Sequence, residues 1–343
     1  MKHIFSVLFL MILCLMAACT QDNIHNPEES DKAHIVFNPM EIGMTRAVQT
    51  TTATISSYGV SSSVYDASST YSAAACGSYF FNEEVTAATG VCKYYWPGTA
   101  YRISFFAYAP YGNNALTLSS AKDKVGRPVY SYTVPSNVTN QLDVITTEVL
   151  DMSGTTKTTP VQLKFHHRLS DIRFSAFNQN AAEPITIKKI TIYGVKYSGT
   201  LEGEEWSLGS ALSTASTGEC NYSPNLEVTA GTTLDVTGTS GHFMILPQTA
   251  TPTFVIVTTE NGSERTYTTT LNSSFNFQMG KSYTFKLTLG DGTLIVDTDT
   301  DIQDWAVETK YLTVNSVGTN GTWSQPSVTD GQDVGIENWV EEE

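Results

Sequence analysis

Short stretches in which apolar and polar residues alternate recur along most of this chain. The alternation is clearest at Tyr101–Ala109 and at residues 283–289, where every second side chain is apolar or aromatic. Such a period of two is typical of a strand with one face on a core. Clusters of Gly, Asn, Asp, Ser and Pro separate the stretches, and no long apolar stripe has helical spacing, so we expect an all-β fold. The stretches with strand character are residues 34–37, 101–109, 129–134, 161–177, 185–195, 242–246, 254–258 and 282–289.

The alternation changes parity at two places. Apolar residues fall on odd positions up to Leu169 and on even positions after Asp171. Because a slip of one residue sends side chains to the opposite face, Ser170 and Asp171 mark a bulge or a crossing between sheets. A similar slip surrounds Lys188 and Lys189.

The first residues read as an export signal. Lys2 supplies a positive charge, residues 4–18 form an almost unbroken apolar run, and polar residues follow from Thr20. A helix needs about 20 apolar residues to cross the hydrocarbon of a bilayer. The run is shorter than that, so a cleavable signal peptide is favoured over a retained membrane helix.

The end of that run resembles the bacterial lipobox. Ala17 and Ala18 are small residues directly before Cys19, and Met16 stands where Leu is usual. The resemblance implies signal cleavage between Ala18 and Cys19, with acyl chains such as palmitate on Cys19. The alternative is an ordinary secretory signal with an incidental cysteine.

The polar stretch 178–184 ends in proline and lies between two predicted strands, which makes it the expected domain boundary. Residues 20–32 are polar without periodicity and are expected to act as a tether. We expect a signal peptide at 1–18, a tether at 19–32, two β-sandwich domains at 33–180 and 181–305, and an acidic tail at 306–343.

Charge and cysteine content narrow the function. The chain carries 34 acidic and 19 basic residues, a balance that repels phosphate backbones, so no nucleic acid is expected as a partner. Beyond the signal region the cysteines are Cys76, Cys92 and Cys220, and their spacing does not resemble a zinc site. Cys76 and Cys92 either staple a hairpin as a disulfide or remain thiols.

Several segments, taken together and in order, resemble the fimbrillin superfamily, the lipoprotein-derived subunits of type V pili in anaerobic Gram-negative bacteria. The most recognisable is residues 163–174, which follow the pattern Phe-x-His-x-Leu-small-x-Ile-x-Phe. The other segments are residues 94–97, 103–110, 142–145, 245–248 and 302–305.

This resemblance implies two tandem transthyretin-like β-sandwich domains and assembly with other pilus subunits by strand exchange. The first strand, containing Ile35, Val36 and Phe37, would be removed by an Arg-specific protease that cuts between Arg46 and Ala47. The precursor would be held in the outer membrane by its lipid anchor and the product would lie in a surface fimbrium. The alternative is that Arg46 is a solvated loop residue of an uncut lipoprotein.

The last segment of the chain is strongly acidic. Residues 297–343 hold eleven acids and one lysine. Within them, residues 311–317 have strand character and residues 335–340 end in an aromatic anchor, so either is a possible donor strand. The alternative is a flexible acidic tail.

The sequence shows no arrangement typical of an enzyme or a cofactor site. It contains no Gly-x-Ser-x-Gly, His-Glu-x-x-His, phosphate loop or Cys-x-x-Cys, so we expect no enzyme and no cofactor. His166 and His167 are adjacent on a strand and point to opposite faces, so they cannot share a metal ion, and we expect His167 to be hydrogen-bonded in the core.

The spacing of Asp297, Asp299 and Asp301 mimics a calcium loop, but Ile302 stands where that loop requires glycine. We therefore expect an acidic strand there and no metal site.

The functional prediction is a structural pilus subunit or pilus-associated surface lipoprotein. The alternative is a surface adhesin or glycan-binding lipoprotein that does not polymerise, in which Trp206 or Trp323 would stack on sugar rings.

Overall fold

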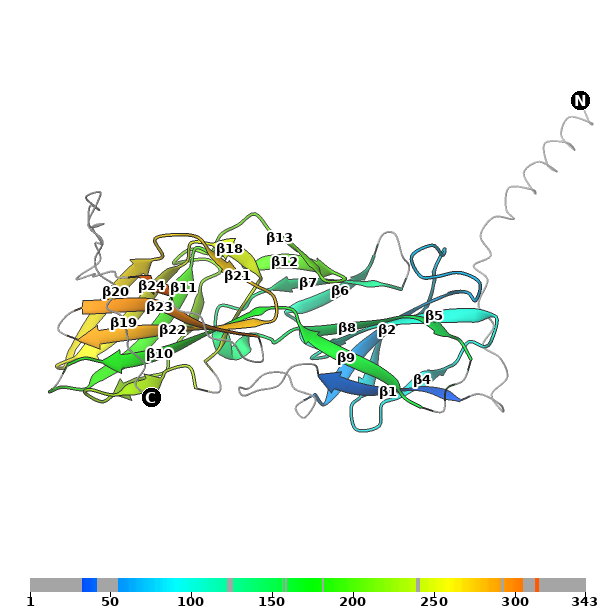
Figure 1. Ribbon diagram of the computed structural model, residues 1–343, viewed down its shortest axis with the longest axis horizontal. Helices are drawn as coiled ribbons and strands as arrows, with labels where there is room; N and C mark the ends of the chain where they lie inside the picture. The colour runs from blue at the N-terminus through cyan, green and yellow to red at the C-terminus, as the bar shows by residue number, and fades with distance from the viewer. Residues whose placement is uncertain are drawn as a thin grey trace, which may run out of the picture.

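The computed structural model has two lobes arranged end to end along its long axis (Figure 1). The structure describes residues 33–41, 55–121, 126–155, 157, 159–180, 182–238, 241–290, 293–304 and 312–314. Within these ranges every regular element is a strand, apart from the short 3-10 turn η3 (Val138–Asn140). The prediction of an all-β fold is confirmed.

The first lobe is built on a seven-stranded sheet with the order β3-β2-β5-β8-β9-β1-β4, in which only β1 and β9 pair in parallel. Its two sides fold over one core: the Phe37 ring lies 5.0 Å from that of Phe105, and Tyr58 lies 6.0 Å from Phe165. The strands are β1 (His34–Glu41), β2 (Ser57–Asp66), β3 (Gly77–Thr86), β4 (Val91–Tyr95), β5 (Tyr101–Ala109), β8 (Ile145–Ser153) and β9 (Val161–His167).

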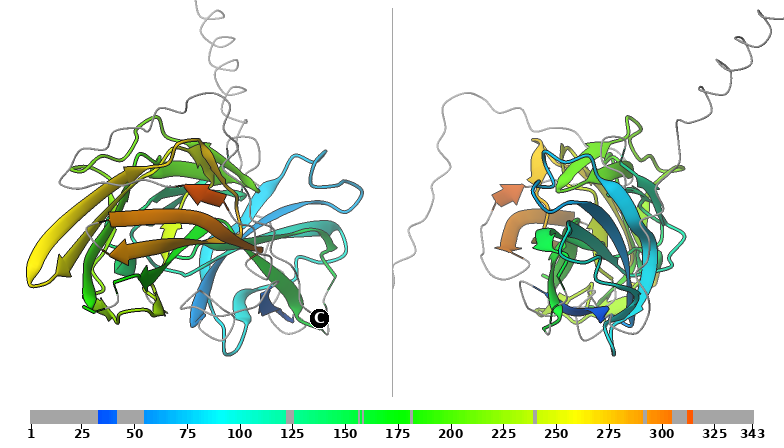
Figure 2. Two further views of the ribbon diagram at one scale, coloured as in Figure 1. Left: turned by 60° about the vertical axis from the view of Figure 1, so that its left-hand side comes forward. Right: turned by 90° about the vertical axis from the view of Figure 1, so that its right-hand side faces the viewer.

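The second lobe is a sandwich of two larger sheets. One has the order β16-β10-β22-β23-β24 with β17 beside β10, and the other has the order β14-β11-β19-β20 with β15 beside β11. Phe254 lies between the sheets, 5.6 Å from Phe174 and 5.0 Å from Phe285. In the left view of Figure 2 the yellow and orange strands of this lobe lie apart from the cyan strands of the first. The strands are β10 (Ser170–Asn178), β11 (Ile185–Tyr193), β14 (Cys220–Tyr222), β15 (Leu226–Val228), β16 (Thr233–Asp235), β17 (Phe243–Ile245), β18 (Gln248–Ala250), β19 (Thr253–Glu260), β20 (Ser263–Thr270), β21 (Phe275–Phe277), β22 (Lys281–Gly290), β23 (Thr293–Asp304) and β24 (Leu312–Val314).

A four-stranded sheet joins the lobes. It has the order β13-β12-β7-β6, with β6 (Leu116–Ser120), β7 (Pro128–Thr133), β12 (Ser198–Glu202) and β13 (Glu205–Leu208). Leu116, Tyr130 and Tyr132 are buried in the core of the second lobe, although the chain passes through them before it completes the first. The two halves of the chain therefore interlock instead of following each other.

Both parity slips in the sequence have structural counterparts. At Ser170 the chain leaves the first lobe, because β9 pairs with β1 and β8 whereas β10 pairs with β22 and β17. Between Ile187 and Lys189 the pairing of β11 with β19 shifts register. The first slip is a crossing between sheets and the second is a bulge.

The strand pairing also bears on the domain boundary expected at 180–181. β10 and β11 both belong to the second sandwich, and Asn178 Nδ2 donates to Glu183 O at 2.9 Å and to Val228 O at 3.0 Å. The polar stretch 178–184 is thus a loop within one lobe, since polar residues there satisfy backbone groups of the loop. We propose a boundary at 168–169 instead.

Arg168 secures this crossing. Its Nε donates to Thr146 Oγ1 at 2.6 Å, its Nη1 lies 3.2 Å from Glu204 Oε1, and its carbonyl accepts from the indole of Trp206 at 2.7 Å. These contacts tie β8 of the first lobe to the turn between β12 and β13. Trp206 is partly buried and also packs against the second-lobe core.

A buried carboxylate follows the crossing. Asp171 is fully buried, and its oxygens accept from Arg173 Nε at 2.7 Å and Ser282 Oγ at 2.8 Å and lie 2.9 Å from His242 Nδ1. Burial acts to raise the pKa of Asp171, but the hydrogen bond from His242 and the charge of Arg173 outweigh it and hold the pKa below its ordinary value.

Asp171→Ala is expected to destabilise the protein by about 3–5 kcal/mol, the usual cost of removing one partner from a buried ion pair. Because the folded-state pKa is lowered, the stability that Asp171 supplies is present above its unfolded pKa of about 3.9 and is lost as the pH falls through the lower folded value. Urea unfolding at neutral and acid pH measures both effects. The matched control is Asp66→Ala, an exposed carboxylate, which should change the midpoint little. Equal midpoints for the two variants would contradict the assignment.

Candidate functional site

Strand β1 is the first element of the described part of the chain and lies inside its sheet, between β9 and β4. Phe37–Glu41 pairs in parallel with residues 161–165 of β9, and the beginning of β1 pairs antiparallel with β4. Ile35 is fully buried and Phe37 is 3% exposed. The strand predicted to be removable therefore completes the core of the first lobe.

The groove that holds β1 is apolar. Ile35 and Phe37 belong to a buried cluster that includes Phe105, Leu163 and Phe165. Burying a side chain of this size contributes about 1.5–3 kcal/mol. Loss of β1 would expose that cluster and leave unpaired backbone groups on both β4 and β9.

Gly90 allows the backbone of β1 to lie very close to the turn before β4. It has φ +64°, and a Cβ built on it would overlap the Phe37 carbonyl oxygen. The Phe37 amide donates to Gly90 O at 2.8 Å. The turn before β4 therefore contacts the backbone of β1 directly, which only glycine permits.

Two polar atoms lie buried in the core around the groove. Among the described residues, the Tyr58 hydroxyl and the Trp96 indole N–H find no hydrogen-bond partner. Burial, with a smaller contribution from Cys92, raises the pKa of Tyr58. Trp96 N donates to Ala33 O at 3.3 Å, so it adjoins the start of β1. An unpartnered buried donor is costly, so these two atoms act against the stability of the first lobe.

The tail forms one described strand. β24 pairs antiparallel with β23, with Val314 opposite Val296 and Leu312 opposite Thr298, and lies beside β23 at the edge of the sheet (Figure 1). Asp297, Asp299 and Asp301 lie along β23.

Some of the predicted site residues lie in the described part of the chain and others lie outside it. Ile35, Val36 and Phe37 lie in β1, as expected for the first strand. The lipidation and signal-cleavage residues Ala18 and Cys19, the processing residues Arg46 and Ala47, and Trp323 lie outside the described residues. In the described part of the chain, no helix is long and apolar enough to cross a bilayer.

The remaining sequence expectations concern a histidine and the cysteines. His167 is 5% exposed and its Nδ1 lies 2.9 Å from Asp143 Oδ1, which confirms the core assignment. Cys92 and Cys220 are free buried thiols, so the Cys76–Cys92 disulfide is not formed. Cys76 packs instead against a separate cluster that includes Tyr71 and Ala74.

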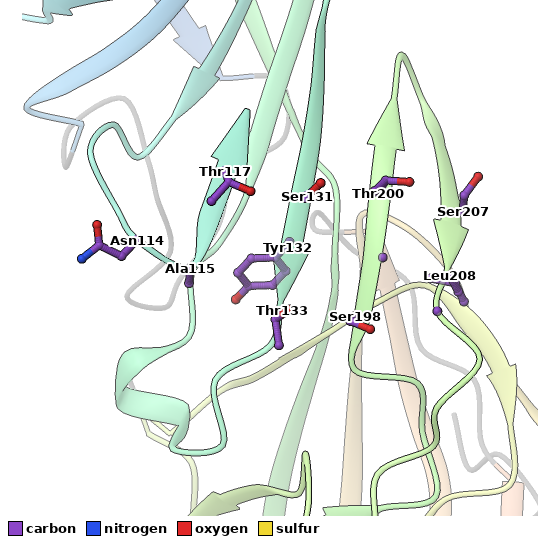
Figure 3. A pocket seen from close by; sticks show the side chains of 12 residues that line it. Asn114, Ala115, Thr117, Ser131, Tyr132, Thr133, Ser198, Thr200, Ser207 and Leu208 are labelled. Atoms are coloured by element: carbon purple, nitrogen blue, oxygen red, sulfur yellow. The ribbon is translucent and has the colours of Figure 1, made fainter. Parts of the chain in front are cut away.

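The joining sheet carries a shallow hollow of about 490 Å³ (Figure 3). A row of hydroxyl groups crosses it, from residues that pair in register on successive strands. These residues are Thr117, Ser131, Thr200 and Ser207. The lining contains no carboxylate, histidine, lysine or arginine. Its titratable side chain is the phenol of Tyr132, whose pKa is raised by burial.

Comparison with known proteins identifies a family. The model of the fimbrillin-like family matches residues 45–305. The chain belongs to the fimbrillin-like family. Its match begins beside Arg46, after β1, and ends at Trp305, before the acidic tail.

Individual relatives are distant. Fimbrium subunit Fim1C of Phocaeicola vulgatus is 26% identical in an alignment of 187 residues, and the match covers 49% of this chain and 49% of that one. This fimbrillin-like chain therefore spans about half the length of that relative. A fimbrial protein of Bacteroides vulgatus has a TM-score of 0.59 at 16% identity, covering 79% of this chain and 99% of that one. A candidate cell adhesion protein of Bacteroides ovatus has a TM-score of 0.54 at 17% identity, covering 81% and 99%. The structural matches support the fold.

Proposed function

We propose that this fimbrillin-like chain is a structural fimbrial subunit that assembles by protease-triggered strand exchange. One observation carries the proposal: β1 is an amino-terminal strand that fills an apolar groove between β4 and β9, and the Thr-Arg-Ala sequence with Arg46 follows it at once. A cut after Arg46 leaves β1 bound only by non-covalent contacts. A strand from a neighbouring subunit can then replace it and restore both the core and the backbone pairing.

In this proposal the precursor is a lipoprotein of the outer membrane, anchored through Cys19 after cleavage behind Ala18. An Arg-specific protease then separates the anchored segment from Ala47 onward. The partners are the lipid bilayer, this protease and other pilus subunits.

We also propose that the chain has no catalytic activity. The lining of the hollow in the joining sheet holds no carboxylate, histidine, lysine or arginine. Groups of His, Cys, Asp or Glu that could hold a metal ion are absent among the described residues. A structural subunit needs neither.

The test is the mature amino terminus of protein isolated from surface fimbriae. Intact-mass measurement should find a chain that begins at Ala47 without lipid, while the precursor in the membrane fraction begins at lipidated Cys19. Fimbriae built from chains that still begin at Cys19 would contradict protease triggering.

A further inference from the structure

The side chains of β1 define what can replace it. Its inward positions are Ile35 and Phe37, both buried, and its outward positions include the exposed Asn38. Any substitute strand must therefore offer two apolar residues separated by one position.

The tail contains two segments to compare with this pattern. In residues 311–317, Leu312 and Val314 are apolar and share one parity. In residues 336–340, the even positions include Asn338 and the odd positions include Glu337. Whichever set faced inward, the groove would bury a polar side chain without a hydrogen-bond partner. The first segment therefore has the two apolar residues that the groove requires, and the second does not.

The register follows from the same comparison. Placing Leu312 at the Ile35 position puts Val314 at the Phe37 position, and a shift of two residues in either direction puts Lys310 or Ser316 into the core. In this register the outward-facing residues of the tail segment also resemble those of β1. Asn315 falls on Asn38, whose Nδ2 donates to Gln162 Oε1 at 2.8 Å, and Tyr311 falls on His34, whose ring lies 4.3 Å from Tyr95.

We infer that residues 311–316 of a neighbouring copy are the donor strand, and that they enter the groove in the direction and register of β1. This assignment rests on the proposed strand exchange and names the segment that performs it. Leu312 and Val314 occupy the inward pockets, and Asn315 takes the hydrogen bond to Gln162. The segment at residues 336–340 remains outside the groove.

The described part of this segment, β24 (Leu312–Val314), lies on the second lobe of its own chain. β24 pairs with β23 on one side only, at the edge of the sheet, whereas the groove offers pairing to both β4 and β9. Transfer to a neighbour therefore gains backbone hydrogen bonds. Residues 305–311, which connect β23 to the donor strand, span at most roughly 25 Å when extended, so the neighbouring groove lies close to the end of β23.

A pair of cysteines tests the register in the full chain. In β1 the position of Asn38 lies opposite Gln162 of β9. Gln162→Cys with Asn315→Cys should therefore form a disulfide between subunits after cleavage, because neighbouring strands lie about 4.8 Å apart, within the range of a disulfide. The expected result is a ladder that survives boiling without reductant and collapses with it. The matched control, Gln162→Cys with Asn338→Cys, should give no such ladder.

The second test places a charged residue in each tail segment and measures the rate of polymerisation. Val314→Asp should reduce the rate of polymerisation at least tenfold, and Ile336→Asp should leave it unchanged. If the parent polymerises but the Asn338 pair forms the ladder and Ile336→Asp blocks assembly, the donor assignment fails while strand exchange stands. A cut parent that stays monomeric overturns both.

Discussion

Replacing Cys19 with alanine is expected to move the whole protein from the membrane pellet to the soluble fraction and to abolish incorporation of labelled fatty acid. Lipidation requires the thiol of this residue, and alanine has none. Each buried methylene contributes about 0.8 kcal/mol, so a protein that carries several acyl chains binds the bilayer firmly. The variant carries no acyl chain and should not be held there. Fractionation of cells grown with labelled palmitate measures both effects.

The matched control for this variant is Cys14→Ala, which removes the other cysteine of the signal region. Cys14 lies before the expected cleavage point, so its loss should change neither the label nor the pellet. If Cys19→Ala still pelleted and carried label, the lipobox interpretation would be wrong and an ordinary secretory signal would replace it.

The local part of the fold could be predicted because alternation records which side of a strand meets a core. Ile103, Phe105 and Ala107 alternate with residues that pack on the other face of β5, and the structure forms a strand there. The parity change at Ser170 is equally local, since it reports that the chain turns over between two cores.

Long-range pairing could not be predicted from such patterns. β7 pairs with β12, about 70 residues later, and nothing in either segment specifies its partner. The same gap explains the domain boundary: the polar stretch 178–184 looked like a linker, but Asn178 uses its amide to close a loop within one lobe. Polarity marks exposure or local hydrogen bonding, and the sequence alone does not distinguish them.

In the candidate site, too, local features could be predicted from the sequence and long-range contacts could not. Ile35 and Phe37 were identifiable because they are apolar residues of one parity in the first strand. Gly90 was not, because a glycine in a turn has the same sequence pattern whether or not another strand passes against it. The buried Tyr58 hydroxyl was also missed, since only the packed core shows that it has no partner among the described residues.

Arg46→Ala is expected to leave the protein monomeric under conditions in which the parent polymerises. Without a cut after residue 46, β1 remains covalently joined to β2 and returns to its groove whenever it detaches, which keeps its effective concentration far above that of any donor. Incubation with an Arg-specific protease followed by native gel electrophoresis measures the result: a ladder for the parent and one monomer band for the variant.

Two further variants separate cleavage from donation. Arg46→Lys keeps the positive charge but should resist an Arg-specific protease and stay monomeric, so the effect is assigned to the cut and not to the charge of the side chain. Deletion from Ala306 onward should give subunits that are cut at Arg46 yet form no ladder, because they hold an open groove and no donor. Such subunits expose the apolar cluster around Phe105 and are expected to aggregate without order, a state that added full-length donor should relieve. An Arg46→Ala protein that forms ladders as readily as the parent would show that β1 need not be released, and the uncut surface lipoprotein would then be the better account.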